Sequence, residues 1–539
     1  MAEAKTFKTT AFMIMVSVLL SRILGFIRTA LIPIKLGGLS DVADAYTAAF
    51  QISDLMYGLL VGGAIAASLI PVLTGFIEKK EEKEGWRVVS SFINIMILIM
   101  LGLAVLSVVF APQLMNVIAR GFLGAPPEKM LLTVKLTRIL VPIAFFMMLS
   151  GFCNGILNSY SKFAVAAFGP VVYNLASVLS IFFLSNPDPN DDYGVVKVAM
   201  GIVGCALLYF IFQFVFTFRH LKHYVPVIQT RHPEFSKMVR LAVPSLLTST
   251  LMQVNVIVSK AYTTFFDTGS VAALELANKT WQMPLGIIAQ SIGVAMLPAM
   301  SALYARNKHT DILEKLKSAI RFVLFLGLPS AGAMAVLSRP MVQLLFNFGG
   351  KLGPEGVELT ASILSFYSIA LVAQCVSTIM NRAYYSTKNS FIPFVNGAIT
   401  VVLNLGLAYV ITAYTGMGVK GIAFAFSISS IVNTILLVNL FKMRIRDFKF
   451  FSIGDYYLKI ILSTLVMMGV ILLMDAMLLP VVFRAGIMDI SKIAQAAWVG
   501  AEVVVGMAVY FTASHLLKVR EAGDIVGGAF RKLKKIAKI

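Results

Sequence analysis

Apolar stretches long enough to cross a lipid bilayer recur along this chain from Thr9 to Leu517, separated by short polar breaks. A helix that spans the hydrocarbon core needs about 20 mostly apolar residues. Hydrophobic residues make up 58% of the chain and charged residues only 13%, whereas soluble domains have about 25% charged residues. The sequence therefore predicts an all-α integral membrane protein of about fourteen transmembrane helices, without a sizeable soluble domain.

The cations of the chain are distributed unevenly among the predicted connections. The segments are expected to begin near residues 9, 44, 87, 131, 163, 195, 238, 271, 318, 357, 391, 418, 456 and 494. With the N-terminus inside, even-numbered connections and both tails hold 31 of the 46 Lys and Arg residues, and the other connections hold nine. This pattern obeys the positive-inside rule and predicts a multi-pass membrane protein with both termini cytoplasmic. The surplus cations behind the net charge of +20 are thus explained by the orientation of the chain in the membrane. We therefore expect no nucleic-acid partner.

The cysteines and the C-terminal tail lead to two separate expectations. Cys153, Cys205 and Cys375 all lie within apolar segments, which predicts packing residues and no disulfide, metal site or cofactor. The basic tail Lys518–Ile539 is expected either to lie on the anionic inner leaflet or to act as a plain stop-transfer cluster.

The chain resembles itself at an offset of about 227 residues. Ala66–Pro71 matches Gly293–Pro298, and Asn154–Phe163 matches the segment that contains Asn381 and Tyr385–Lys388. Because an even number of helices separates the two copies, both have the same orientation in the membrane.

The repeat predicts two six-helix lobes related by a pseudo-two-fold axis along the membrane normal. We place the first lobe at residues 1–235 and the second at 236–450, with 451–539 as an additional helix pair and the basic tail. Such folds suit transport by alternating access. A duplicated bundle with a purely structural role is the alternative.

Six cations fall inside predicted helices: Arg22, Arg28, Lys135, Arg138, Lys260 and Lys279. Each costs about 2.5–3.5 kcal/mol at the bilayer centre, so such residues indicate a water-filled or ligand-filled cavity. Lys135, Arg138 and Lys260 are close to predicted outer ends and can reach the interface. Arg22 instead lies about 20 Å along its helix and cannot.

Arg28 follows Arg22 by six residues, which places the two arginines about 120° apart on one helix. They can face one broad cavity, and Gly25 between them leaves space for a bulky ligand.

The predicted eighth helix has a polar face. Glu275, Asn278, Lys279 and Gln282 recur at i, i+3, i+4 and i+7, and Pro284 can kink the helix just beyond them. The alternative interpretation is a Glu275–Lys279 pair that only neutralises itself.

The second helix adds four polar candidates, namely Asp44, Gln51, Asp54 and Tyr57. Asp44 is near the outer end and can also be simply solvated. A cavity dominated by Arg and Lys indicates an anionic ligand such as a pyrophosphate, for which arginine supplies planar bidentate donors.

The motif Ser21-Arg22-Ile23-Leu24-Gly25-Phe26-Ile27-Arg28 resembles the S-R-x-x-G-x-x-R signature of the MurJ/MviN lipid II flippases. Three further segments resemble that family: Asp44-Ala45-Tyr46, Asn278–Pro284 and Arg382–Ser386. The resemblance implies a transporter, not an enzyme, of the multidrug/oligosaccharidyl-lipid/polysaccharide exporter superfamily. Such a flippase moves the undecaprenyl-pyrophosphate-linked peptidoglycan precursor from the inner to the outer leaflet, in support of cell-wall synthesis and cell shape.

On this resemblance Arg22 and Arg28 bind the pyrophosphate, Ser21 belongs to the same site, and Lys279 replaces an arginine of the family's eighth helix. Helices thirteen and fourteen are implied to form the groove for the prenyl tail. The expected partners are the lipid-linked substrate, membrane lipids, and a coupling ion or the membrane potential.

Three positions depart from the family pattern: Thr29, Tyr57 and Gln282 replace charged residues of many members. The substrate consequently stays open between lipid II and another undecaprenyl-linked polysaccharide. An ion-coupled drug exporter on the same fold is a further alternative, with Asp44 and Asp54 as the carboxylates it needs. A membrane-embedded glycosyltransferase is disfavoured because the loops are too short for a catalytic site.

Overall fold

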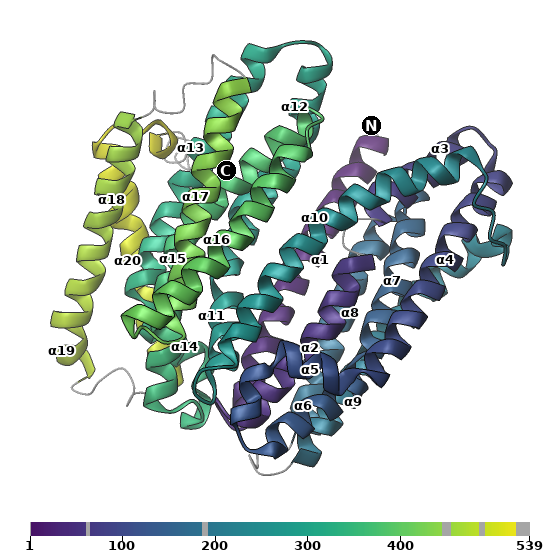
Figure 1. Cartoon of the computed structure of the whole chain (residues 1–539). Helices are drawn as coiled ribbons and strands as arrows, with labels where there is room; N and C mark the ends of the chain where they lie inside the picture. The colour runs from purple at the N-terminus through teal and green to yellow at the C-terminus, as the bar shows by residue number, and fades with distance from the viewer. Residues whose placement is uncertain (1, 61–64, 186–191, 445–453, 484–490, 524–539) are drawn as a thin grey trace. The chain divides into compact units, whose positions relative to one another are not determined.

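The computed structural model describes residues 2–60, 65–185, 192–444, 454–483 and 491–523 (Figure 1). All elements assigned within these ranges are helical. The prediction of an all-α membrane protein is confirmed, because twelve of the described helices are long and apolar enough to cross a membrane. The two other predicted spans fall on the helices of 41–60 and 65–78 and on the helix of 233–263. Most of the predicted basic tail, 524–539, lies outside the described residues.

The chain divides into two compact units, Met1–Glu275 and Leu276–Ile539. The first unit contains α1 (Ala2–Lys35), α2 (Asp41–Leu60), η1 (Ile65–Leu69), α3 (Ile70–Glu78), α4 (Glu82–Val109), α5 (Ala111–Ile118), η2 (Arg120–Gly124), α6 (Pro127–Leu140), α7 (Pro142–Ser159), α8 (Phe163–Leu184), α9 (Asp192–Thr217), η3 (Phe218–His223) and α10 (Pro233–Thr263). Helix α11 (Ser270–Leu285) begins in the first unit and ends in the second.

The second unit contains η4 (Gly286–Gln290), α12 (Ser291–Ala305), α13 (His309–Val336), α14 (Ser338–Phe346), η5 (Phe348–Gly350), α15 (Gly353–Ser386), α16 (Phe391–Thr415), α17 (Lys420–Arg444), α18 (Gly454–Leu473), η7 (Met474–Leu478), α19 (Leu479–Phe483) and α20 (Lys492–Leu516). The predicted lobe boundaries at 235/236 and 450/451 follow the sequence repeat and stay a prediction.

The internal repeat reappears in the order and the bounds of the helices. Helices α4 and α5 have the same lengths and spacing, to within one residue, as α13 and α14, which follow 227 residues later. Four non-glycine residues with positive φ are spaced by the same interval: Lys80 (62°) and Asn307 (57°), and Ser161 (59°) and Lys388 (56°). Each ends a helix, which is where a left-handed residue stops helical hydrogen bonding. The duplication predicted from the sequence therefore extends to individual turns.

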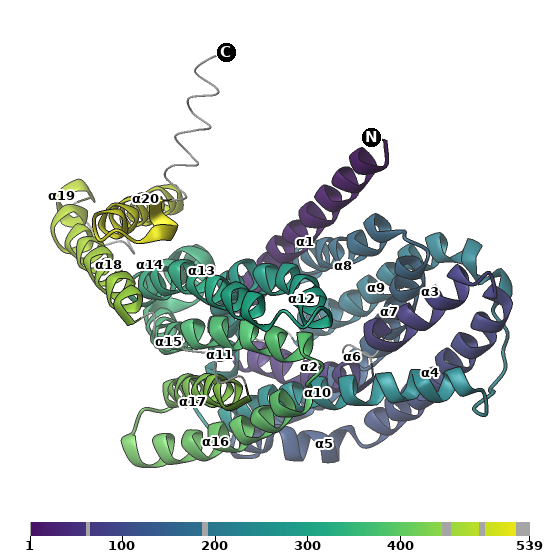
Figure 2. The same cartoon turned by 90° about the horizontal axis from the view of Figure 1, so that it is seen from above.

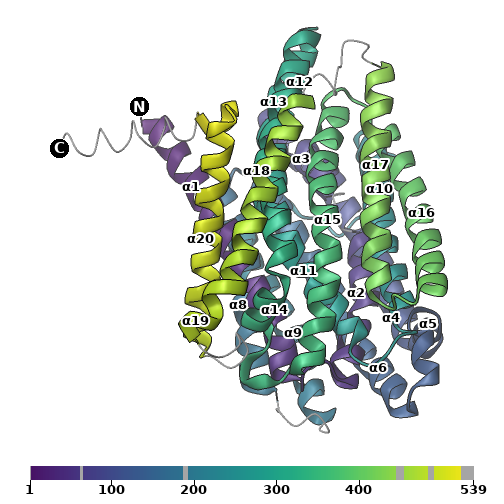
Figure 3. The same ribbon diagram turned by 90° about the vertical axis from the view of Figure 1, so that its left-hand side faces the viewer.

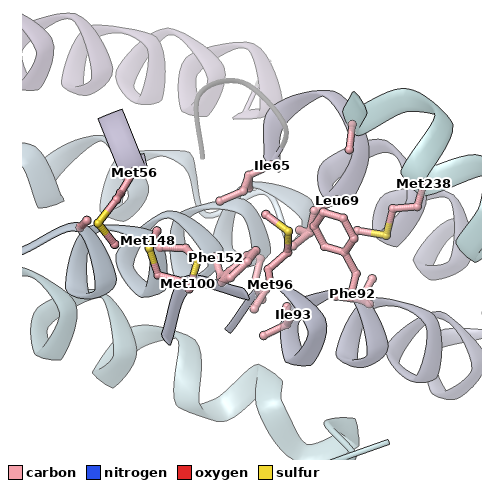
Figure 4. Close-up of a cluster of buried hydrophobic side chains, with 14 of the residues drawn as sticks. Met56, Ile65, Leu69, Phe92, Ile93, Met96, Met100, Met148, Phe152 and Met238 are labelled. Atoms are coloured by element: carbon pink, nitrogen blue, oxygen red, sulfur yellow. The ribbon is translucent and has the colours of Figure 1, made fainter. Parts of the chain in front are cut away.

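The first unit has an apolar core between α2, α4, α7 and α10. Met56, Met96, Met148, Phe152 and Met238 are among its buried side chains (Figure 4). Methionine fills irregular gaps because its side chain is unbranched and flexible. Helix α1 packs along α8 beside this core.

In the second unit α15 is packed between α13 and α17, and α16 covers α17. Helices α18 and α20 lie side by side, and both also contact α13 (Figures 2 and 3). Large apolar side chains such as Val402, Leu465 and Val504 are exposed on these helices. Exposed apolar surface on this scale is expected where helices face hydrocarbon chains.

Candidate functional site

Helix α1 holds the two arginines of the first sequence motif, and α8 fixes its position. Asn174 Nδ2 on α8 donates hydrogen bonds to Ser21 Oγ at 3.0 Å and to the Ser21 carbonyl oxygen at 3.2 Å. A Cβ built on Gly25 would lie 3.5 Å from Asn174 Oδ1, an ordinary van der Waals distance. The packing of α1 on α8 therefore does not require glycine here, and the Asn174 side chain occupies the space next to Gly25. The expected approach of a bulky ligand at Gly25 stays a prediction.

Arg28 is held against an aromatic face. Its Cζ lies 5.3 Å from the centroid of the Tyr173 ring on α8, within the range of a cation–π interaction. It also interacts electrostatically with Asp54 on α2. These contacts fix the guanidinium without burying it completely, since Arg28 is only partly buried.

Asp54 connects Arg28 to a second cation. Lys260 Nζ on α10 forms an ion pair with Glu275 Oε2 on α11 at 3.0 Å, and Lys260 also interacts electrostatically with Asp54. Two cations and two carboxylates from four helices thus lie within electrostatic range, and we call Arg28, Asp54, Lys260 and Glu275 the charged cluster. The sequence left Lys260 open between a place at the membrane interface and a functional role, and in the structure the residue is only 7% exposed and is paired within the protein.

Asp44 has a different environment from the one expected for a solvated residue. It is 1% exposed, and its carboxylate accepts hydrogen bonds from Lys129 Nζ at 3.0 Å, Gly269 N at 2.8 Å and Ala272 N at 2.9 Å. The two backbone donors belong to the start of α11, where N–H groups lack helical partners and a carboxylate is favoured. Asp44 therefore anchors α11 to α2.

The other two candidates on α2 differ in burial. Gln51 is 1% exposed, and neither of its amide atoms has a hydrogen-bond partner among the described residues. Tyr57 is 41% exposed. A buried amide without partners costs about 1–3 kcal/mol, so Gln51 has the character of a residue retained for a ligand or a water molecule.

In the second unit Asn278 organises the polar face of α11. Its Oδ1 accepts hydrogen bonds from Trp281 Nε1 at 2.9 Å and from Gln282 Nε2 at 2.8 Å. The neighbouring Lys279 is exposed. The predicted distortion after Pro284 is present, because the helix continues as the π-helical turn η4. The predicted convergence of Arg22, Arg28 and Lys279 on one cavity involves both compact units and stays a prediction.

The second unit also contains an apolar pocket of about 510 Å³. It is formed by α13, α15, α17 and α18 and is lined by Leu328, Ala331, Gly332, Ala335, Ser368, Ile369, Val372, Ala373, Val376, Ile431, Thr434, Ile435, Ile461, Thr464, Leu465 and Met468. Nearly all of these side chains are apolar, so the pocket suits a hydrocarbon chain.

Comparison with known proteins places this arrangement in a family. The family model described as "Lipid II flippase MurJ" matches residues 35–486. This chain belongs to the MurJ lipid II flippase family. A relative in Buchnera aphidicola named "Probable lipid II flippase MurJ" is 28% identical over 84% of this chain and 87% of its own. A relative of the same name in Rickettsia prowazekii is 25% identical over 93% of this chain and 96% of its own.

Solved structures agree with this family. A structure titled "Lipid II flippase MurJ, inward closed conformation" has a TM-score of 0.77 and 25% identity, over 94% of this chain and 98% of that chain. An inward-facing multidrug resistance MATE transporter has a TM-score of 0.66 at 19% identity, over 79% of this chain and 95% of its own. The second likeness concerns the fold alone, which this chain of the MurJ family shares with MATE transporters.

Lys129 is a residue that sequence reasoning missed. Besides Asp44, it forms an ion pair with Asp41 at 2.6 Å. Asp41 and Asp44 are three residues apart on one helical face, which indicates that a cation is nearby. Their partner is 85 residues from Asp44 in the sequence, so spacing alone gives no means of choosing it from among the many cations of a MurJ-family chain.

Proposed function

We propose that this protein translocates lipid II, the undecaprenyl-pyrophosphate-linked peptidoglycan precursor, from the inner to the outer leaflet of the plasma membrane. The observation that carries the proposal is the match of the MurJ family model to residues 35–486. The protein acts as a transporter without a chemical reaction on its substrate, and its termini lie in the cytoplasm. Its partners are lipid II, membrane lipids, and a coupling ion or the membrane potential.

The pyrophosphate is the group that the cations of the site recognise. Arg22 and Arg28 supply planar, bidentate donors that match phosphate oxygens, and Lys279 supplies a point charge. Ser21 and the amides of Gln51, Asn278 and Gln282 add neutral hydrogen-bonding groups around them. Alternating access then exposes these residues to one side of the membrane and then to the other.

Two carboxylates of the charged cluster already neutralise the cations next to them. Arg28 interacts with Asp54, and Lys260 pairs with Glu275 at 3.0 Å. An entering pyrophosphate therefore replaces a resident carboxylate near Arg28. Asp44 supports the site indirectly by holding the start of α11, and Tyr57 adds an exposed phenol on α2.

The prenyl tail is expected in the apolar pocket of α13, α15, α17 and α18. Each methylene removed from water contributes about 0.8 kcal/mol, so a chain of this kind is held without any polar contact. Helix α18 belongs to the helix pair that the family resemblance assigns to the tail.

The proposal is tested with Arg22→Ala in cells depleted of their own flippase. We expect the variant to reach the membrane and to lose about 10- to 100-fold of its translocation rate, because a charge-assisted hydrogen bond contributes about 1.5–3 kcal/mol. The rate is measured as the appearance of labelled lipid II in the outer leaflet. Full growth and full translocation by Arg22→Ala would contradict the assignment of the pyrophosphate site.

A matched control is available on α6. Arg138 is also a cation within a membrane helix, but it is exposed and its Nε donates to the carbonyl oxygen of Val108 at 3.2 Å. Arg138→Ala should retain translocation. Arg22→Lys should recover part of the rate, because it restores the charge but not the bidentate geometry.

Two other cargoes are separated by the same assay. Translocation of another undecaprenyl-linked glycan without lipid II would identify a polysaccharide flippase. The likeness to MATE transporters keeps an ion-coupled drug exporter as the second candidate. That function predicts drug sensitivity on deletion without a defect of the cell wall, and dependence on Asp54.

A further inference from the structure

A carboxylate is buried in the C-terminal helix pair formed by α18 and α20. Glu502 is 0% exposed and follows the start of α20 by ten residues, or about 15 Å. Neither of its carboxylate oxygens has a hydrogen-bond partner among the described residues. A buried charge without such partners is costly enough that a group of this kind normally takes up a proton or a ligand.

A second carboxylate faces it from the neighbouring helix. Asp475 lies in η7, the continuation of α18, and acts electrostatically on Glu502. Trp498, one turn before Glu502 on α20, donates its Nε1–H to Asp475 Oδ1 at 3.4 Å. The Trp498 indole therefore orients the Asp475 carboxylate next to Glu502.

Glycine brings the two helices close at this depth. A Cβ on Gly506 would lie 2.8 Å from Ile471 Cδ1, so a larger residue at this position would require the Ile471 side chain to move. Gly506 is one turn beyond Glu502, and Ile471 is one turn before Asp475. The short distance between the helices keeps the two acids together.

Four cations on the packed helices are bound to other groups in the described part of the chain. From α13, Arg321 pairs with Glu521 at 2.9 Å, and from α14, Arg339 pairs with Glu358 at 3.5 Å. Lys459 on α18 pairs with Asp455 at 2.7 Å, and Lys492 on α20 donates to the carbonyl oxygen of Gln343 at 2.6 Å. The imidazole of His515, toward the far end of α20, is 13 residues beyond Glu502, or about 20 Å along the helix.

Two adjacent carboxylates in surroundings of low dielectric constant cannot both be ionised, so one proton is shared between them. A metal cation is a poor alternative, because hard cations bind six or more oxygen ligands. The described residues contain no group of three or more His, Cys, Asp or Glu placed to hold a metal ion.

We propose that Asp475 and Glu502 form a proton-binding site in the C-terminal helix pair. One carboxyl group carries the proton and the other accepts its hydrogen bond, which joins α18 to α20. Release of the proton to water leaves two negative charges that repel each other and separate the helices. The site makes the packing of this helix pair dependent on pH, whatever cargo the protein transports.

The test is infrared difference spectroscopy on the purified full-length protein in lipid nanodiscs, without substrate. The wild type should show the C=O stretching band of a buried protonated carboxyl group at neutral pH, and the band should disappear at alkaline pH. Glu502→Gln should remove it and Asp475→Asn should shift it. The same band in the wild type and in both variants at every pH would overturn the proposal, as would its absence from the wild type.

The matched control is Asp455→Asn, because Asp455 also lies on α18 but is exposed and paired with Lys459. It should leave the band unchanged. If Glu502→Gln does not yield monodisperse protein, Glu502→Asp and Asp475→Asn carry the test, since both should shift the band. The measurement needs no lipid II, so its outcome is independent of the proposed flippase function.

Discussion

At the scale of single residues, the structure separates charges that support the fold from charges that remain accessible. Asp44 and Lys129 are almost completely buried, at 1% and 5% exposure, and each has its partner. Asp54 and Lys279 are exposed, and Arg22 and Arg28 are partly buried. The exposed and partly buried charges are therefore accessible to a ligand without disruption of the fold. The buried pair of Asp44 and Lys129 is not.

The buried ion pair leads to a stability prediction. Replacing Lys129 by Met should destabilise the protein by about 3–5 kcal/mol, because it leaves the Asp44 carboxylate buried without its cation. Thermal unfolding of the detergent-solubilised protein measures the effect. Lys237→Met is the control, since Lys237 forms a largely exposed pair with Glu234. Equal unfolding temperatures for Lys129→Met and the wild type would show that the pair does not stabilise the fold.

Sequence reasoning found the motif arginines because α1 carries them in a recognisable spacing, and it correctly expected the distortion after Pro284. It did not find Lys129, because the contact with Asp44 depends on how α6 packs against α2. It also did not identify Asp475 and Glu502, although each is an acid inside an apolar segment, because their proximity depends on how α18 packs against α20.

At the scale of helices, the apolar pocket depends on small residues where α13 meets α18. A Cβ on Gly332 would lie 2.7 Å from Thr464 Cγ2, so the two helices are in close contact along one edge of the pocket. Gly332 and Thr464 both line the pocket of about 510 Å³, together with residues of α15 and α17. The lack of a side chain at Gly332 thus allows α13 and α18 to meet at the wall of the pocket.

Filling this pocket is the corresponding prediction. Val372→Trp on α15 should occupy much of the volume and lower the rate of lipid II translocation several-fold, while leaving binding of a tail-free pyrophosphate headgroup unchanged. Val402→Trp is the matched control, because Val402 is 72% exposed on α16 and its replacement only enlarges the apolar surface. Equal rates for the two variants would place the tail elsewhere.

The order of the helices was predictable from apolar stretches, whereas their interruptions were not. The segment expected to begin near residue 131 is one membrane span, Pro127–Ser159, within which two assigned helices, α6 and α7, meet at Val141 and Pro142. Similarly, α4 is followed directly by the separate helix α5. Hydropathy averages over a window of about 19 residues, so it does not register a change of direction at a single residue.

At the scale of the whole molecule, the repeat and the cation distribution predict the orientation of the chain in the membrane. An impermeant maleimide should label Lys351→Cys from outside intact cells, whereas Lys308→Cys should react only after permeabilisation. Both positions are exposed, and the three native cysteines are buried, so background labelling should be low. Labelling of Lys308→Cys in intact cells would reverse the predicted orientation of the chain.

The charged cluster has a consequence for the half of the transport cycle in which no cargo is bound. Arg28 and Lys260 have the carboxylates of Asp54 and Glu275 beside them, so the empty carrier holds its own counter-ions. It can return to the loading side without exposing unneutralised cations to a medium of low polarity and without trapping a chance anion from the cell. On the proposed function, a small phosphate should therefore be exported poorly. Only a ligand that displaces the carboxylate of Asp54 or Glu275 from its cation should be transported.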